Sequence, residues 1–293
     1  MSATGSGTQM DPYIVDNWDD FLSVCNLTAS TWIRWADADE KIIDFNEINP
    51  QGYDSTIEIK GNVDFNNWEL RNITSTAQFV IRLSGTSSIR PTVKNLKITN
   101  GKQIWMLNGG AFLSETWVEL ENITISYEFD YAGSNSYAIA TGSGGGNYYR
   151  VGVYAYGMTR AGGYWGFFSS VRNIRYGRFH CEVQTQNTPN VCNANLVDSV
   201  VSGTIIVDND NVTQILVGAA NSTLNVIRLQ SNKTIRYNGA GISLKIDRDY
   251  TGDIIRPNTA TWDEHVLVVN EAQSRTQQEE ILAAGFPLHK AVD

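Results

Sequence analysis

A short phrase, consisting of an apolar residue, any residue, Asn and a second apolar residue, recurs through the middle of the chain at a nearly constant step. The successive spacings are 23, 27, 51, 25 and 27, and 51 is about two steps. Because Asn makes up 27 of the 293 residues, the phrase alone is weak evidence and the constant step carries the argument. Such a period is the signature of a solenoid, in which each repeat packs only on its neighbours. The clear copies contain Asn72, Asn95, Asn122 and Asn173, and looser copies lie near Asp198 and Asn225.

The residues that flank each copy alternate between apolar and polar, as in Leu120, Ile123 and Ile125, which predicts strands rather than helices. A leucine-rich repeat is excluded because Leu is sparse and Ile, Val and Thr take the inward positions. We therefore predict an all-β fold, a single right-handed parallel β-helix with rungs of about 25 residues, a rung being one full turn of the chain. The repeated Asn residues are predicted to lie at turns, either bonded to the equivalent Asn above and below or as separate surface turns.

The first part of the chain resembles a known cap. Residues 14–27 have the pattern of an amphipathic helix, with Asp16 or Asn17 as its cap, and strands are predicted near 31–36, 41–45 and 55–60. The segment 57–65 then leads into Leu70-Arg71-Asn72-Ile73. This order resembles the N-terminal cap and first rungs of pectate-lyase-like β-helix proteins, most of all the non-catalytic ones of bacteriophage virions and prophages. The resemblance covers roughly residues 12–250, and it implies the fold far more strongly than the function.

The predicted organisation has four parts: an N-terminal tail (1–13), an N-terminal cap (14–60), the β-helix (61–255) and a C-terminal cap (256–293). Thr276 to Glu279 form a capping box, and Gly285 and Pro287 follow, so a short C-terminal helix is expected to close the solenoid or to dock a partner. The polar tail is expected to be held by a neighbouring subunit.

Residues 127–168 are expected to form an insertion, since the regular phrase lapses there. This segment holds 12 of the chain's 31 aromatic residues and several glycines, which predicts a long loop or hairpin that leaves one rung. Three interpretations stay open: a protein interface, a small core beneath the loop, or a carbohydrate contact. The candidate binding residues are Tyr148, Tyr149, Tyr154, Tyr156, Tyr164 and Trp165.

Several classes of function find no support in the sequence. The net charge of −9 and the lack of a basic run argue against nucleic acid as a partner. The sequence has no apolar run long enough for a membrane span, so no insertion into a membrane is predicted. The start of the chain does not resemble a signal peptide. The paired carboxylates typical of β-helix glycosidases are missing, so no catalytic residue and no cofactor is predicted. Asp208 and Asp210 are weak candidates for a metal ion, and a solvated turn is the preferred interpretation.

The sequence thus predicts a non-enzymatic structural protein of a bacteriophage virion, either a head decoration or a component of a fibre or spike. Its predicted partners are other virion proteins or copies of itself, and its predicted location is the virion. The alternatives are a carbohydrate-binding module that recognises a bacterial surface glycan, and a divergent polysaccharide lyase or hydrolase.

Overall fold

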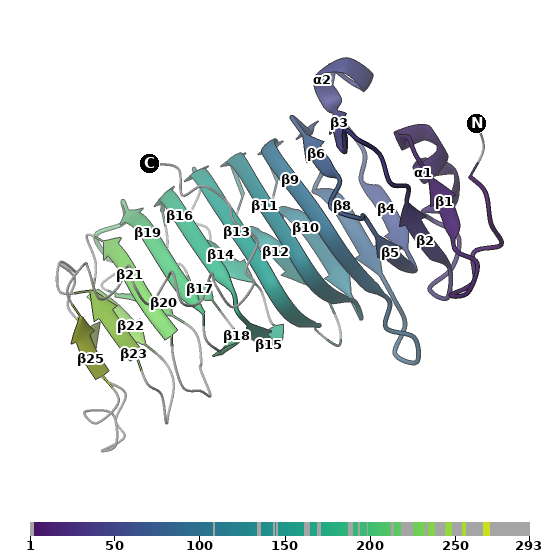
Figure 1. The fold of residues 1–293 in the computed structure, drawn as a ribbon. Coiled ribbons are helices and arrows are strands. Elements are labelled where there is room, and N and C mark those ends of the chain that lie inside the picture. Colours follow the sequence, from purple (N-terminus) through teal and green to yellow (C-terminus); the bar gives the residue numbers. More distant parts are fainter. Residues whose placement is uncertain are drawn as a thin grey trace.

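The computed structural model is a right-handed parallel β-helix with two short helices at its N-terminal end (Figure 1). It describes residues 3–107, 109–133, 136–142, 144, 146–160, 165–168, 171–186, 190–192, 194–197 and 199–211, and then strand segments within 214–269. The expected C-terminal helix lies outside the described residues.

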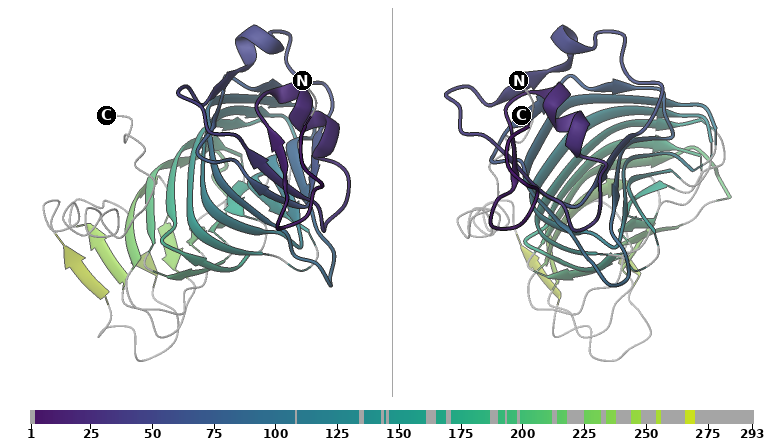
Figure 2. Two further views of the ribbon diagram at one scale, coloured as in Figure 1. Left: turned by 45° about the vertical axis from the view of Figure 1, so that its right-hand side comes forward. Right: turned by 90° about the vertical axis from the view of Figure 1, so that its right-hand side faces the viewer.

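The largest sheet has 16 strands and forms one wall of the solenoid along its whole described length (Figures 1 and 2). The main row of neighbouring strands in this sheet is β1-β2-β5-β9-β11-β13-β16-β19-β21-β23-β25, and every pairing in this row is parallel. In chain order its strands are β1 (Tyr13–Val15), β2 (Trp32–Trp35), β3 (Ile42–Asp44), β5 (Asn62–Asp64), β6 (Glu69–Arg71), β7 (Thr74–Ser75), β9 (Thr92–Trp105), β11 (Glu119–Tyr131), β13 (Asn147–Thr159), β15 (Val171–Arg175), β16 (Arg178–Thr185), β18 (Ala194–Val197), β19 (Val200–Val207), β21 (Asn225–Ser231), β23 (Leu244–Asp247) and β25 (Val266–Val269).

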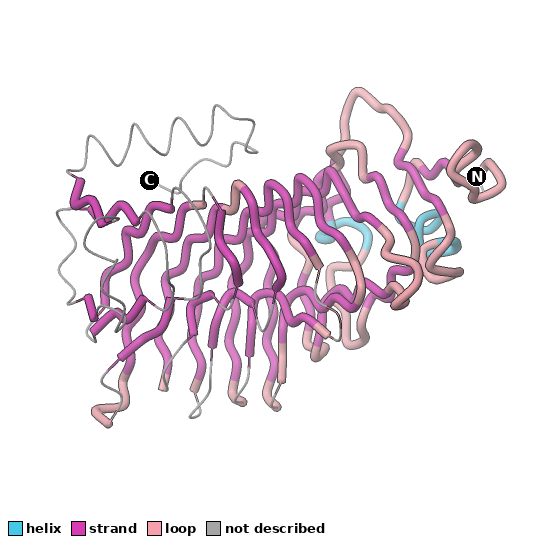
Figure 3. Tube along the Cα trace, turned by 90° about the horizontal axis from the view of Figure 1, so that it is seen from below, coloured by secondary structure: helices cyan, strands magenta, loops and turns pink. Residues whose placement is uncertain are grey.

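Two smaller sheets follow one another along the solenoid behind the large sheet, and β14 of the first contacts β17 of the second (Figures 1 and 3). The five-stranded sheet contains β4 (Ile57–Lys60), β8 (Phe79–Ser84), β10 (Ala111–Thr116), β12 (Ser136–Thr141) and β14 (Trp165–Phe168). The four-stranded sheet contains β17 (Asn190–Cys192), β20 (Gln214–Val217), β22 (Thr234–Tyr237) and β24 (Ile254–Ile255).

The register gives the length of each rung as the difference between the numbers of two paired residues. This difference is 30 where Val63 pairs with Val93, and it is 22 where Ile174 pairs with Leu196. The predicted constant step is therefore an average over rungs of unequal length. Alternate residues of each strand point inward, and apolar side chains from neighbouring rungs stack into one continuous core.

Aromatic side chains fill the first rungs. Trp35 is fully buried, and its ring lies 5.4 Å from Phe21, 5.9 Å from Phe65 and 4.9 Å from Trp68 between ring centres. Phe21 belongs to helix α1 (Trp18–Val24), which covers the open end of the core. The helix is shorter than predicted because residues 13–15 form a strand. Its cap is Asn17, whose side chain accepts a hydrogen bond from the backbone N–H of Asp20. The second helix, α2 (Phe45–Ile48), is a single turn.

The N-terminal tail folds onto its own chain. Thr4 and Ile14 exchange two backbone hydrogen bonds in an antiparallel bridge, and the carbonyl of Gly7 accepts a hydrogen bond from the backbone N–H of Trp32. Residues 3–11 therefore contact the solenoid of their own chain, and the expectation that a neighbouring subunit holds the tail stays a prediction.

The expected insertion at 127–168 is also corrected. Its residues form the second half of β11 and the strands β12, β13 and β14, all of which pair in parallel with the rungs on both sides or on one side. The described aromatic residues of this segment therefore belong to regular rungs. Inward-facing Tyr127, Phe129 and Tyr131 pack on each other at the core.

Candidate binding surface

One bend of the large sheet is built on residues with positive φ. Asn95 and Asn122 occupy this bend with φ of 58° and 55°, a conformation that Asn tolerates better than other side chains do. Asn122 Nδ2 donates to Asn95 Oδ1 at 2.8 Å, and Asn95 Nδ2 donates to Asp64 Oδ1 at 2.8 Å. The three side chains form a hydrogen-bonded ladder that joins three successive rungs.

The other two predicted Asn residues belong to different columns. Asn72 has a φ of 61° at a second bend, donates to Asp44 and accepts a bond from Asn100 at 3.3 Å. Asn173 lies before the first bend, where its Nδ2 donates to Asn147 Oδ1 at 3.0 Å. The four residues therefore mark three columns of the solenoid and not one.

Many charged side chains on the outer face also join neighbouring rungs. Glu69 accepts hydrogen bonds from Lys97 at 2.7 Å, from Arg71 at 3.1 Å and from the hydroxyl of Thr99. Partial burial works to raise the pKa of Glu69, but these three donors outweigh it and hold the pKa at about 2. Further pairs between rungs are Glu58 with Arg82, Glu119 with Arg90, Asp64 with Lys94, and Asp130 with Arg160.

A second carboxylate lies inside the solenoid. Glu115 is fully buried and accepts hydrogen bonds at 3.2 Å from the backbone N–H groups of Val118 and Gly146 and from the hydroxyl of Tyr148. Burial raises the pKa of Glu115 despite these bonds. Its donors come from two rungs, so the buried carboxylate fixes a corner of the solenoid.

The predicted tyrosines divide between the core and the surface. Tyr148 is buried in the core and Tyr154 is buried on the outer face beside Arg178 and His180, which corrects their prediction as exposed binding residues, whereas Tyr149 and Tyr156 are partly exposed. Tyr164 lies outside the described residues, and of Trp165 the structure describes only its place in β14.

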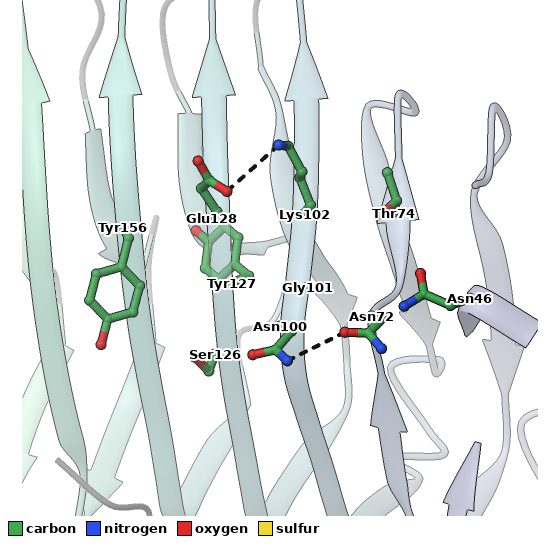
Figure 4. Close-up of a pocket in the computed structure, with 10 residues that line it drawn as sticks. All are labelled: Asn46, Asn72, Thr74, Asn100, Gly101, Lys102, Ser126, Tyr127, Glu128 and Tyr156. Carbon is green, nitrogen blue, oxygen red and sulfur yellow. Dashed lines mark hydrogen bonds and ion pairs between the residues drawn. The ribbon is translucent and has the colours of Figure 1, made fainter. Parts of the chain in front are cut away.

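Partly exposed Tyr156 lines a hollow on the outer face, called the larger hollow below, a shallow space of about 520 Å³ that crosses β7, β9, β11 and β13 (Figure 4). Lys102 and Glu128 face each other here at 3.7 Å, and both are largely exposed. The phenol oxygen of Tyr156 is buried and has no hydrogen-bond partner among the described residues. The remaining lining is polar, with Asn46, Asn72, Thr74, Asn100 and Ser126 around the backbone at Gly101 and Tyr127.

The smaller hollow, of about 370 Å³, lies on the other side of the Asn95 and Asn122 bend. Tyr149 and Tyr176 pack edge to face there, with 5.6 Å between ring centres. The guanidinium groups of Arg150 and Arg175 lie over these two rings at 5.0 and 4.9 Å. Asn147, Asn173, Glu119 and Glu121 are among the residues that complete the wall.

Next to the larger hollow, His180 contacts a serine and a glutamate. Its Nδ1 lies 3.0 Å from Ser202 Oγ, and its Nε2 lies 3.7 Å from Glu182 Oε1. Burial lowers the pKa of His180 against the opposing effect of Glu182. Ser202 Oγ also lies within bonding distance of the Phe179 carbonyl, and its strand is paired on both sides, so no pair of free backbone donors is available for an oxyanion. The geometry fits a cross-strand contact better than a hydrolase site.

The structure places Asp208 and Asp210 on the surface directly after β19. Asp208 accepts hydrogen bonds from the side-chain amides of Gln184 and Gln186, and both aspartates are exposed. Within the described ranges, no group of three or more His, Cys, Asp or Glu side chains is placed to hold a metal ion. In the same part of the chain, neither helix has the length and apolar character to cross a membrane.

The residues predicted from the sequence did not include Lys102, Glu128 and Glu69. Lys102 and Glu128 lie directly opposite each other on the neighbouring strands β9 and β11. Opposite charges separated by the length of one rung are therefore the sequence signal that indicates such a pair.

Comparisons with known proteins give no relative for this chain. No protein-family model matches it, and neither the curated proteins nor the solved structures contain a match. The parallel β-helix is a property of the structure itself, whereas the link to pectate-lyase-like and phage proteins is carried by the sequence resemblance alone.

Proposed function

We propose that this chain is a non-enzymatic structural protein of a bacteriophage particle, in which a rigid β-helix serves as a head decoration or as part of a fibre or spike. The observation that supports this proposal is that polar side chains of neighbouring rungs are hydrogen-bonded to one another. Asp64, Asn95 and Asn122 form one ladder. Glu69 accepts hydrogen bonds from Lys97 and Thr99 of the next rung. Catalysis needs such groups directed at a substrate, whereas here they stiffen the solenoid.

The phage setting comes from the resemblance of the cap and first rungs to non-catalytic virion proteins. A structural subunit makes lasting contacts with other proteins of the particle, and the lysines of the first rungs report on such contacts. Four of them, Lys41, Lys94, Lys97 and Lys102, have partly exposed side chains on the outer face.

The test is lysine cross-linking of purified particles followed by mass spectrometry, with the isolated chain as control. We expect cross-links from these lysines to other particle proteins or to further copies, in addition to those of the isolated chain. A chain that is absent from the particle, or that yields only the cross-links of the isolated chain, would falsify the proposal.

The larger hollow supports a second candidate, the binding of a saccharide. Its lining combines the amides of Asn72 and Asn100, the hydroxyl of Ser126 and the exposed pair of Lys102 and Glu128. Such groups offer donors and acceptors to the hydroxyls of a sugar, while the ring of Tyr156 offers an apolar face. The hollow crosses four strands, so it spans roughly 14 Å at the usual distance between strands, which is enough for a short stretch of glycan.

A glycan array followed by calorimetry tests this candidate, and two tyrosines of β13 provide a matched pair. Tyr156→Ala is expected to weaken binding about tenfold or more, since the aromatic wall of the hollow is lost. Tyr149→Ala, on the same strand but in the smaller hollow, is expected to keep the affinity of the wild type. Equal effects of both changes, or no binding to any glycan, would exclude the larger hollow as the binding site.

A further inference from the structure

The outer edge of β1 ends the large sheet. On its inner side β1 pairs in parallel with β2, and Val15 accepts a bond from the backbone N–H of Ala36. On its outer side only the tail contacts it among the described residues, through the two hydrogen bonds that Ile14 exchanges with Thr4. Since neighbouring residues of a strand point their backbone groups to opposite sides, Ile14 is the residue that offers N–H and C=O outward.

The cover over this edge is thin. Residues 4–6 and 8–11 are exposed, and of the described tail only Ala3 packs against the hydrophobic core from a partly buried position. The tail has little apolar area to hold it down. Its turn is held by exposed hydrogen bonds, in which the carbonyl of Asp11 accepts from the backbone N–H groups of Ser6 and Thr8 and from the Ser6 hydroxyl, and the N–H of Asp11 donates to the Thr8 hydroxyl. A segment with few buried contacts and exposed hydrogen bonds opens at a lower free energy than the rest of the fold.

Displacement of the tail would expose the ring of Tyr13 and the backbone N–H of Trp32 in addition to the backbone groups of Ile14. Gly7 lies directly over the ring of Tyr13, where a Cβ at position 7 would collide with the ring edge. The carbonyl of Gly7 also satisfies the backbone N–H of Trp32. An open edge would therefore present the outward groups of Ile14 beside the exposed faces of Tyr13 and Trp32, which is a template for pairing with another chain.

We propose that the outer edge of β1 is a contact between two copies of this chain, closed in the isolated protein by residues 3–11 and used once they are displaced. The edge already accepts an antiparallel bridge from Thr4 of the tail. Antiparallel pairing of β1 with a second β1 places Ile14 opposite Ile14 across a two-fold axis, and each supplies the N–H and C=O that the other needs. Tyr13 then lies opposite Val15, so no like charges meet. This inference rests on the proposed structural role, because it names the partner of one surface.

The test measures the mass of the isolated chain and of a chain that lacks residues 1–11, by size-exclusion chromatography with light scattering. We expect the full chain at one copy, 32.5 kDa, and the shortened chain at twice its own mass in a concentration-dependent equilibrium. Ile14→Pro in the shortened chain removes the outward N–H but leaves the pairing with β2, so the mass should return to one copy.

A second variant guards against misfolding of the shortened chain. Thr4→Pro in the full chain removes one of the two hydrogen bonds between Thr4 and Ile14 and is expected to give a partial shift to the dimer. The proposal is overturned if the shortened chain stays at one copy with an unchanged circular dichroism spectrum, or if its dimer survives Ile14→Pro. Either result leaves cross-links on the particle unaffected, so the two proposals fail independently.

Discussion

Two carboxylates in neighbouring parts of this solenoid meet opposite environments. Glu69 lies on the outer face among Lys97, Arg71 and Thr99, and its pKa is held at about 2. Glu115 lies in the core, where burial raises its pKa although three donors point at it. Outside, charge is compensated by charge, whereas inside, a carboxylate is compensated by backbone N–H groups and one phenol.

The difference shows how the solenoid uses its polar groups. An outer group that loses its partner can turn to water, so each outer bond is individually weak. An inner group cannot, and the loss of its partner leaves a buried donor or acceptor unsatisfied. The inner polar groups should therefore be few and indispensable, and the outer ones many and individually replaceable.

The largest expected effect follows from removing the inner carboxylate. Glu115→Ala leaves the N–H groups of Val118 and Gly146 and the hydroxyl of Tyr148 without this acceptor, so the free energy of unfolding should fall by about 4 kcal/mol. Urea denaturation followed by circular dichroism measures the change. Glu115→Gln keeps one acceptor oxygen and should lose roughly half as much. A loss below about 1 kcal/mol for Glu115→Ala would show that water reaches this corner.

The outer ladder should be weaker. Asn122→Ala loses both the hydrogen bond to Asn95 and the tolerance of Asn for positive φ, and we expect a loss of about 2 kcal/mol. Asn122→Gly keeps the backbone freedom and loses only the bond, so its cost should be about 1 kcal/mol. If Asn122→Gly is as stable as the wild type, the ladder contributes nothing beyond the backbone conformation.

The pH dependence of stability should have opposite signs at the two carboxylates. The folded pKa of Glu69 lies below its unfolded value, so its contribution is present above pH of about 4.3 and disappears as the pH falls through about 2. The folded pKa of Glu115 is raised, so its contribution is present below its unfolded pKa and disappears as the pH rises through the folded one.

Two variants separate these contributions in urea titrations at a series of pH values. Glu69→Gln should reduce the loss of stability between pH of about 4 and about 2 by about 1 kcal/mol, a figure lowered for solvent screening. Glu115→Gln should remove a decline of stability that begins above pH of about 4.3. Parallel curves for both variants and the wild type would contradict the assignment of the two environments.

The sequence predicted the fold through its period, because a solenoid repeats the same contacts at each rung. It could not predict which Asn residues share a column. The bend that begins with Asn95 and Asn122 continues through Arg150 and Tyr176, which have positive φ without being Asn. A repeat defined by Asn therefore has no member at the bend in these rungs, and it includes Asn173, which lies before the bend.

The same gap explains the error at the tyrosines. Tyr148 points inward and Tyr149 outward, and the bend at Arg150 then resets the alternation, so that Val151 points inward again. Composition showed many aromatic and glycine residues in this segment, but only the register shows that its strands continue the rungs. The larger hollow could not be predicted from the sequence for a related reason, because its wall is formed by residues from several rungs.

The smallest expected effect comes from extending the Asn ladder by one rung. Arg150 has a φ of 55°, which is costly for a long side chain, and it occupies the position next to Asn122 in the following rung. Arg150→Asn relieves this cost and allows the new amide to donate to Asn122 as Asn122 donates to Asn95, but it gives up the contact of Arg150 with the ring of Tyr149. We expect a net gain of about 0.5 kcal/mol, measured as a small rise in the thermal midpoint. Arg150→Lys keeps a long cationic side chain at positive φ and should show no gain. A loss of stability in Arg150→Asn would mean that the stacked arginine and tyrosine side chains hold this bend more firmly than the Asn ladder holds the bend one rung before it.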